Sequence, residues 1–218
     1  MEIPEIEAFL ASPDSQQRLK AITELREYEP EVAVPLLKSK IKDSEFLVRS
    51  FAAMGLGKKQ TAESFAALLE VIKFDRDPNV RSEAANSLSL FGKVSLPHLV
   101  TLFHRDDHWL VRRSILAAFF ELDCPDEMFD VCVCGLEGDD PTVKEASIQG
   151  LGFLANSAKQ EAALEKLLPL VNAQWWRTRL FVAKALGQFH NPQAKEALNK
   201  LRNDSDHRVI AAVLESLI

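Results

Sequence analysis

The chain has 218 residues, of which 47% are hydrophobic and 27% are charged, as is usual for a folded globular protein. Its formal net charge of −6 argues against sequence-independent binding of nucleic acid and against docking on anionic lipid, because both need a basic surface. No apolar run approaches the roughly 18 residues of a membrane span, so membrane insertion is not expected.

The N-terminus and the cysteines indicate a cytoplasmic protein. The first eight residues, Met-Glu-Ile-Pro-Glu-Ile-Glu-Ala, lack the basic stretch and apolar run of a signal peptide. The chain has three cysteines, Cys124, Cys132 and Cys134. An odd, small number of cysteines in a chain of this size fits a reducing compartment better than a disulfide framework.

Short amphipathic helices, here called A helices, are predicted to alternate with a second set, the B helices. In chain order we expect A helices near Glu5–Ala11, Glu31–Lys42, Ala62–Phe74, Leu96–Phe103, Asp126–Gly135, Lys159–Val171 and Gln193–Asn203. Several follow a Pro or a Ser, Thr, Asp or Asn, which are common at helix N-termini. Gly57, Gly92 and Asn156 are expected to end helices.

Each B helix has a basic residue near its start, and this position recurs with a steady period. It is occupied by Arg18, Arg49, Arg81, Arg112, Lys144 and Arg179, and by Ile210 in the last unit. The successive differences are 31, 32, 31, 32, 35 and 31 residues. Positions one before, three after and seven after it are mostly apolar and share one helical face. Small residues recur six positions after it, as expected where helices approach closely.

The repeat predicts an all-α fold, a right-handed α-solenoid of about seven helical hairpins in a single domain of residues 1–218. A hairpin of this kind buries its apolar face only by stacking on its neighbours. The basic column Arg49, Arg81, Arg112, Lys144 and Arg179 is interpreted as structural, each side chain bonding an Asp or helix-end carbonyls nearby.

The last B helix is expected to leave an apolar end uncovered. Val209, Val213 and Leu217 lie on its apolar face, and no repeat follows them in this sequence. We therefore expect self-association, or binding of a partner, through the C-terminal repeat.

Several segments resemble a known family. Asp77–Arg81, Asp140–Lys144 and Leu186–Pro192 resemble the helix starts and hairpin turns of the HEAT-like repeats of phycobilin lyases, and the resemblance covers essentially the whole chain. His108–Ile115 and Trp175–Val182 look most like the NblB-type members, which take part in phycobilisome degradation. The resemblance implies a cyanobacterial protein near the phycobilisome, on the cytoplasmic side of the thylakoid. The partners it implies are phycobiliproteins (phycocyanin and allophycocyanin) and the small adaptor NblA.

Aromatic residues and arginines near the starts of alternate B helices are the candidate binding residues. Rings stand three positions before the basic column in the second, fourth and sixth units. A linear bilin carries two propionates, so an arginine beside a ring is a sensible way to hold one, with phycocyanobilin as the candidate ligand and no cofactor. The alternatives are local packing for the rings and a solvated helix face for the arginines. The candidates for binding a partner or a bilin are Phe46, Trp109, Arg113, Trp175, Trp176 and Arg177.

No conventional catalytic arrangement is found in the sequence, so we assign no catalytic residue and no metal ligand. Cys132 and Cys134 point away from each other on a helix and are interpreted as small buried hydrophobes, whereas Cys124 is the thiol expected to be exposed. His104 and His108 flank an acidic turn and are interpreted as solvated residues rather than as metal ligands.

Three functions remain open at this stage. The favoured hypothesis is a scaffold that binds phycobiliproteins and aids their dismantling in phycobilisome degradation. The second is an enzyme, a phycobilin lyase or lyase subunit that attaches or detaches thioether-linked bilin. The third is a generic HEAT-like adaptor for an unrelated process. A lyase depends mainly on holding the bilin beside its acceptor cysteine, so the lack of a catalytic motif counts only mildly against it.

Overall fold

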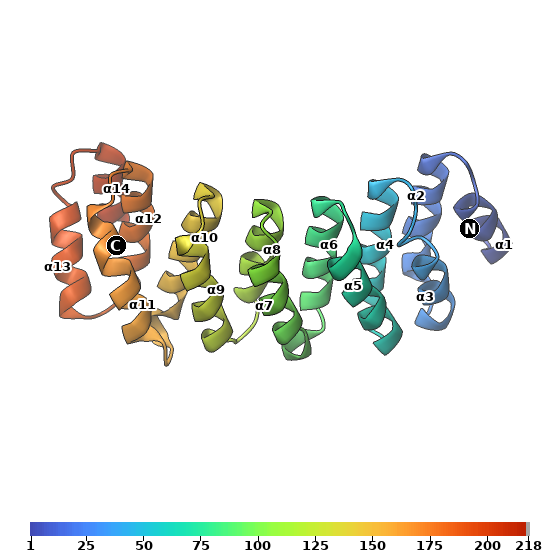
Figure 1. Cartoon of the computed structure of the whole chain (residues 1–218), viewed down its shortest axis with the longest axis horizontal. Coiled ribbons are helices and arrows are strands. Elements are labelled where there is room, and N and C mark those ends of the chain that lie inside the picture. The colour runs from blue at the N-terminus through green and yellow to red at the C-terminus, as the bar shows by residue number, and fades with distance from the viewer. Residues whose placement is uncertain (217–218) are drawn as a thin grey trace. The chain divides into compact units, whose positions relative to one another are not determined.

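A computed structural model describes residues 1–216, which form fourteen α-helices and four short 3-10 helices without a β-strand (Figure 1). This arrangement confirms the expected all-α fold. No helix within the described residues is both long and apolar enough to cross a lipid bilayer.

The helices pair into hairpins, each made of one A helix followed by one B helix. The A helices are α1 (Ile3–Leu10), α3 (Pro30–Lys38), α5 (Ala62–Phe74), α7 (Leu96–Arg105), α9 (Pro125–Glu137), α11 (Gln160–Leu167) and α13 (Pro192–Leu201). The B helices are α2 (Ser15–Glu24), α4 (Phe46–Lys59), α6 (Pro78–Ser89), α8 (Trp109–Phe119), α10 (Pro141–Phe153), α12 (Trp176–Leu186) and α14 (His207–Glu215). The 3-10 helices are η1 (Leu25–Glu27), η2 (Gly92–Ser95), η3 (Leu154–Asn156) and η4 (Leu168–Asn172).

All seven expected A helices are present, and one of them ends earlier than the sequence predicts. The helix expected at Lys159–Val171 is α-helical only to Leu167 and continues as η4. Pro169 explains the change, because proline has no backbone N–H and crowds the preceding turn of an α-helix.

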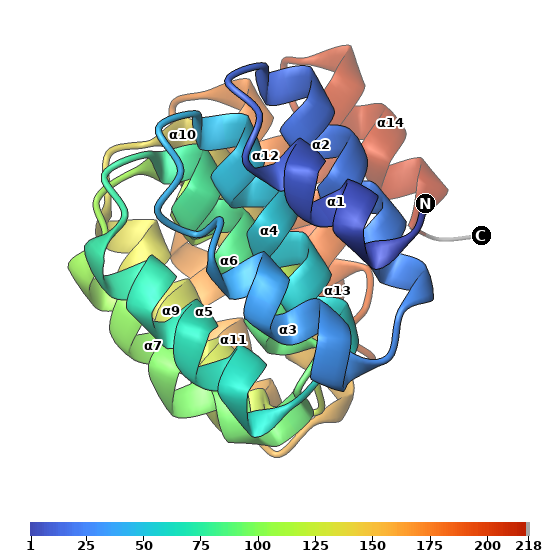
Figure 2. The same ribbon diagram turned by 90° about the vertical axis from the view of Figure 1, so that its right-hand side faces the viewer.

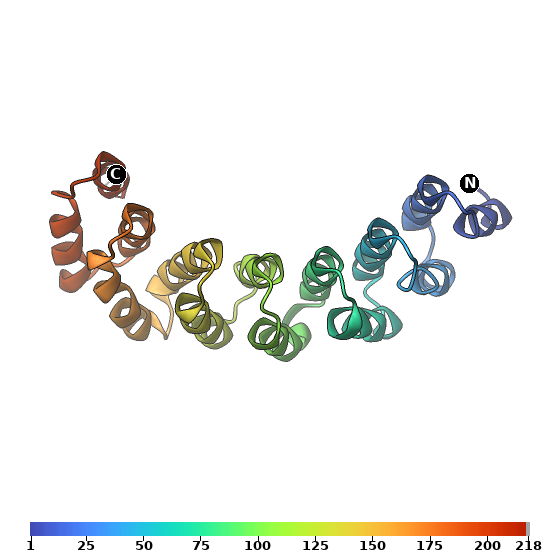
Figure 3. The ribbon, with the colours of Figure 1, turned by 45° about the horizontal axis from the view of Figure 1, so that its top comes forward.

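The chain divides into two compact units, Met1–Ala118 and Phe119–Ile218. In the first unit α2, α4, α6 and α8 form one layer and α3, α5 and α7 form the other (Figures 2 and 3). In the second unit α10, α12 and α14 form one layer and α9, α11 and α13 the other (Figure 3). Each unit buries its apolar side chains where its own helices pack together. Burying one large aliphatic side chain contributes about 1.5–3 kcal/mol to stability.

Successive B helices approach closely through small residues. A Cβ atom added at Gly57 of α4 would lie 2.6 Å from the Cβ of Ser87 in α6, and one added at Gly152 of α10 would lie 2.9 Å from the Cα of Ala185 in α12. The expectation that Gly57 ends a helix is wrong, because α4 continues to Lys59. Gly57 is instead needed for close packing of two helices.

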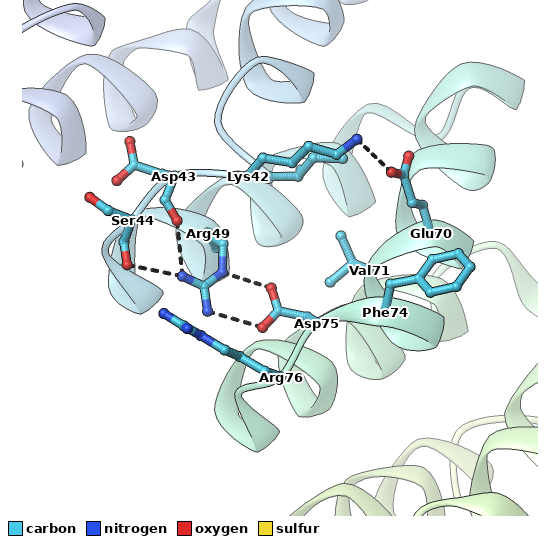
Figure 4. A pocket seen from close by; sticks show the side chains of 10 residues that line it. Lys42, Asp43, Ser44, Arg49, Glu70, Val71, Phe74, Asp75 and Arg76 are labelled. Carbon is cyan, nitrogen blue, oxygen red and sulfur yellow. Dashed lines mark hydrogen bonds and ion pairs between the residues drawn. The ribbon is translucent and has the colours of Figure 1, made fainter.

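A buried Arg–Asp pair joins each of several repeats to the next, as Figure 4 shows for Arg49. Arg49 donates two hydrogen bonds to the Asp75 carboxylate, at 2.7 and 3.0 Å, and Nη1 donates to the carbonyls of Asp43 and Ser44 (Figure 4). Asp75 also accepts from the backbone N–H of Asp77 at 2.9 Å. One arginine thus fixes the turn before its own B helix and the turn before the next.

The same pairing recurs in both units. Each aspartate lies 25 or 26 residues after its arginine, and its side chain is buried. The hydrogen bonds to Asp75 raise the pKa of the Arg49 guanidinium, and the bonds from Arg179 lower the pKa of Asp204. The pairs are Arg18–Asp43, Arg49–Asp75, Arg81–Asp106 and Arg179–Asp204. We call this set the Arg–Asp ladder.

The apolar end expected at the last B helix is not found in the part of that helix that is described. Val209 and Val213 are 0% and 1% exposed, because α14 packs against α12 and α13 of its own unit. The expectation of an uncovered face is therefore wrong for these two residues. Leu217 lies outside the described residues, and Leu214, on another side of the helix, is 45% exposed.

Removing one partner of the ladder is expected to destabilise the first unit strongly. Arg49→Ala leaves the buried Asp75 carboxylate without its cation, which costs about 3–5 kcal/mol of unfolding free energy. Urea denaturation followed by circular dichroism measures this loss. Lys42→Ala is the matched control, because Lys42 pairs with Glu70 but is 76% exposed, and such a pair contributes about 0–1 kcal/mol. Similar losses in the two variants would contradict the structural role of the ladder.

The ladder also predicts a pH dependence for the second unit. The pKa of Asp204 is lowered by its hydrogen bonds from Arg179, so its stabilisation is complete above the unfolded-state pKa of about 3.9 and is lost as pH falls through the lower folded-state value. The stability difference between the parent and Asp204→Asn should therefore be large at pH 7 and shrink below about pH 4. Urea midpoints across this range measure it, with exposed Glu161→Gln as control. A difference that stays constant would contradict the prediction.

Candidate functional site

Helix α4 is apolar on both its buried and its exposed sides. Val48, Ala52 and Leu56 pack into the core at 0% exposure. On the other side, Leu47 is 46% exposed and Phe51 is 38% exposed, and Met54 is half-buried. Spacings of four and three residues place Leu47, Phe51 and Met54 on one side of the helix, and we call them the α4 stripe. Exposed apolar residues gathered on one side of a helix indicate a surface that a ligand or partner covers.

A groove with an apolar floor and a basic end lies beside the α4 stripe, between α2 and α4. Its volume is about 170 Å³. Leu37 of α3 lines it together with Gly55, where an added Cβ would lie 2.8 Å from a methyl group of Leu37. Its lining residues are Ile22, Thr23, Arg26, Leu37, Phe51, Met54, Gly55, Lys58 and Lys59.

The basic end of the groove is formed by Arg26, Lys58 and Lys59, of which Arg26 already pairs with Glu27 at 2.8 Å. Lys59 is held in place, since its ammonium donates to the backbone carbonyls of Arg26 and Tyr28. Lys58 is exposed and has no ion pair within residues 1–216. The groove therefore combines apolar surface with positive charge at one end, which suits an amphipathic ligand with a carboxylate.

Glu83 supplies a carboxyl group on the same side of the neighbouring helix α6. It stands two positions after Arg81, as Phe51 stands two positions after Arg49. Glu83 is half-buried, and burial raises the pKa of its carboxyl against the opposing effects of the Ser87 hydroxyl and the charge of Lys58. It therefore keeps its proton to a higher pH than an ordinary glutamate, which is a property of groups that exchange protons with ligands.

The sequence-predicted residues of the first unit lie at separate B-helix starts. Phe46 is 38% exposed at the start of α4, and Trp109 is 41% exposed at the start of α8, where it stacks on His108 at 5.9 Å between ring centroids. Helix α6 lies between α4 and α8, so the two rings are not brought together (Figure 3). Arg113 is exposed without an ion pair in the described chain.

The second unit brings three of the predicted residues together at the start of α12. Trp175 is 45% exposed. The guanidinium carbon of Arg208 lies over the ring of Trp176, 3.3 Å from the centroid of that ring. Arg177 lies 5.9 Å from the ring centroid of Trp175. We call Trp175, Trp176, Arg177 and Arg208 the α12 cluster.

Both arginines of the α12 cluster already have a carboxylate partner. Arg177 forms two hydrogen-bonded contacts with Glu145, at 2.6 and 2.9 Å, and only 10% of the Glu145 side chain is exposed. Arg208 pairs with Asp206 at 2.8 Å. A ligand carboxylate would therefore compete with an existing bond at either arginine, whereas Lys58 in the first unit has no carboxylate within ion-pair distance and interacts with Glu83 only through its charge.

The basic column follows two patterns. Arg49, Arg81 and Arg179 belong to the Arg–Asp ladder, and Arg112 donates to the backbone carbonyls of Phe103 and Asp106 at 3.2 and 2.7 Å. Lys144 is half-buried in α10.

The cysteines and histidines form no site in the described residues. Cys124, which the sequence predicts to be the exposed thiol, is 4% exposed, so that expectation is wrong. Cys132 is fully buried, and burial raises the pKa of its thiol. No group of three or more His, Cys, Asp or Glu side chains within residues 1–216 is placed to hold a metal ion.

Sequence reasoning missed the α4 stripe, Lys58 and Glu83. The available signal was the segment Phe46–Gly57, in which Arg49 and Ser50 are the only polar side chains and apolar residues occupy the other positions. A search for a helix with a second apolar side would have found it, whereas the search for rings beside arginines did not.

Comparisons with known proteins agree on the repeat. The family described as HEAT repeats matches residues 3–73, 41–119 and 133–218. The bilin biosynthesis protein CpeZ of Synechococcus sp. (strain WH8020) is 22% identical over 177 residues, which cover 76% of this chain and 93% of CpeZ.

Two solved structures share the fold at low sequence identity. One is the complex of CpcE and CpcF of phycocyanin lyase from Nostoc sp. PCC7120, with a TM-score of 0.55, 21% identity, and coverage of 100% of this chain and 96% of that chain. The other is Kap121p bound to Nup53p, with a TM-score of 0.63, 14% identity, and coverage of 99% of this chain and 29% of that chain. At these identities the likeness concerns the fold alone.

If the α4 stripe serves binding rather than folding, changing it should hardly affect stability. Leu47→Gln is expected to change the unfolding free energy by less than about 1 kcal/mol, because Leu47 is 46% exposed. Leu56→Ala on the buried side of the same helix is the control and should cost about 2–5 kcal/mol. Urea denaturation measures both, and a large loss in Leu47→Gln would assign the stripe to the core.

Proposed function

The chain belongs to the HEAT-repeat family, and we propose that it is a phycobilin lyase-type scaffold that binds a phycobiliprotein subunit and its open-chain tetrapyrrole. The observation that carries the proposal is the α4 stripe with its basic groove end, since this surface offers apolar area and positive charge side by side. The similarity to CpeZ, which extends over 93% of that protein, supports the substrate class.

The chemistry of a linear tetrapyrrole fits this surface. Its conjugated rings are apolar and flat, and its two propionates are anionic. In the proposed complex one ring lies against Phe51 and Met54, and a propionate reaches Lys58 at the end of the groove. A groove of about 170 Å³ holds only part of such a pigment, so the rest lies along the open α4 stripe or stays with the phycobiliprotein.

The process we propose is phycobilisome degradation, with phycocyanin and allophycocyanin as partners and NblA as a further adaptor. The resemblance of His108–Ile115 and Trp175–Val182 to NblB-type proteins supports this choice. The protein would recognise the pigmented subunit and hold it for dismantling.

Glu83 favours a second candidate function, attachment or removal of the bilin itself. In attachment, a cysteine thiol of the phycobiliprotein adds across the ethylidene double bond, so that a C–S bond forms and the pigment gains the proton. Removal reverses both changes. A carboxyl with a raised pKa on the same side as Phe51 is suited to give or accept that proton.

The decisive experiment mixes the purified protein with holo-phycocyanin and, separately, with apo-phycocyanin and free phycocyanobilin. Co-elution, visible spectra and subunit masses are followed over hours. We expect a complex with unchanged masses, and Phe51→Ala/Lys58→Glu should weaken it at least tenfold. Phe153→Ala, which truncates an exposed ring of the second unit, is the control for the groove variant. Trp109→Ala/Trp176→Ala tests the sequence-predicted rings in the same way.

Each outcome decides between the candidates. A gain or loss of one bilin mass on the phycobiliprotein subunit that disappears when Glu83 is substituted would favour the lyase. A complex without a change in subunit mass favours the scaffold. Absence of both binding and mass change would overturn the assignment to phycobiliproteins.

A further inference from the structure

Phe74, the last residue of α5, is 70% exposed, which is the highest value for a large hydrophobic side chain within residues 1–216. In Figure 4 its ring points away from the Arg49–Asp75 pair and out from the helix end. The ring contributes little to the core, so its packing in the fold does not explain an aromatic residue here. An exposed ring of this size at a helix end is available as a contact residue, and aromatic residues are enriched in interfaces.

Two hollows that both include Phe74 in their lining combine apolar and charged side chains. One of about 360 Å³ has Ile41 and Val71 in its lining (Figure 4). The other, of about 680 Å³, lies between α5 and α7 and includes Ile72 and Leu102. A side chain of a bound partner can therefore pack beside the ring in either hollow.

Most charged groups around these hollows are already paired within the protein. Lys42 pairs with Glu70 at 2.8 Å, Arg49 with Asp75 at 2.7 Å and Arg81 with Asp106 at 2.6 Å. The fourth acid, Asp43, pairs with Arg18 from the preceding repeat. The two charges within each pair cancel, so the unpaired groups set the net charge around the hollows.

The unpaired groups are mainly cations. Lys73, Arg76 and Arg105 have no ion pair in the described chain. Asp107 is the one acid of the described lining without an ion pair, so the unpaired groups have a net charge of three minus one, or +2. The Lys73 ammonium lies 5.0 Å from the centre of the Phe74 ring. This excess stands out on a chain whose net charge is −6. We call Lys73, Phe74, Arg76 and Arg105 the Phe74 surface.

We propose that the Phe74 surface docks an acidic segment of a partner protein, which packs an apolar side chain beside Phe74 and presents carboxylates to Lys73, Arg76 and Arg105. Charge complementarity selects this occupant, because a purely apolar segment would leave three cations desolvated beside it. A nucleic acid fits poorly, since its phosphates would meet three local cations, Asp107 and an acidic chain. The inference goes beyond the proposed function and holds for any partner that carries such a segment.

The test selects displayed random 12-residue peptides on the whole protein and on the variant Phe74→Ala/Arg76→Glu. We expect the parent to enrich peptides in which acidic residues flank an apolar one, and the variant to lose them. The exposure of both side chains predicts that the variant still folds, which circular dichroism checks.

The best peptide is then synthesised and its affinity measured by fluorescence anisotropy. Phe74→Ala and Arg76→Glu should each weaken binding at least tenfold, and 0.5 M salt should weaken it further. Phe153→Ala and Arg202→Glu, an exposed ring and an exposed arginine of the second unit, should bind like the parent. Enrichment of basic or neutral peptides, enrichment of none, or equal affinity in the Phe74-surface variants would overturn the proposal.

Discussion

The buried Arg–Asp pair is the interaction on which the order of the repeats depends. Arg49 bonds the carbonyls before its own helix and the carboxylate of Asp75, which in turn holds the amide of Asp77 at the next helix start. Desolvating both charges is offset because the guanidinium fork and both carboxylate oxygens find partners. The turns where B helices begin are therefore fixed, and residues near them have defined positions.

A fixed scaffold leaves the remaining surfaces free to vary. The α4 stripe lies on one layer of the first unit and joins apolar area to the cation Lys58. The Phe74 surface lies at the end of α5 and joins a ring to unpaired cations. Both surfaces belong to one compact unit, so the two proposed ligands, a pigment and an acidic protein segment, would bind to the same unit.

The α12 cluster shows why a motif of rings and arginines is an incomplete description of a binding site. Arg177 and Arg208 lie beside tryptophans, as a carboxylate site would require, yet each already bonds a carboxylate of this chain. Glu145 stands 32 residues before Arg177, one repeat away. The sequence shows the arginine and the ring but not which carboxylate the neighbouring repeat brings to them.

The sequence by itself determined the helical repeat. Apolar periodicity and turn prolines depend on residues close in the chain, and the basic column that includes Arg49 and Arg81 recurs at a steady spacing. The sequence could not determine which side chains are exposed. Val209 and Val213 have the same pattern as core residues of inner repeats, and only packing against α12 and α13 shows that they are covered. Phe74 was predicted as a helix residue, but its 70% exposure depends on what the neighbouring repeats leave open. Burial and ion pairing depend on contacts between several repeats, so only the tertiary structure determined them.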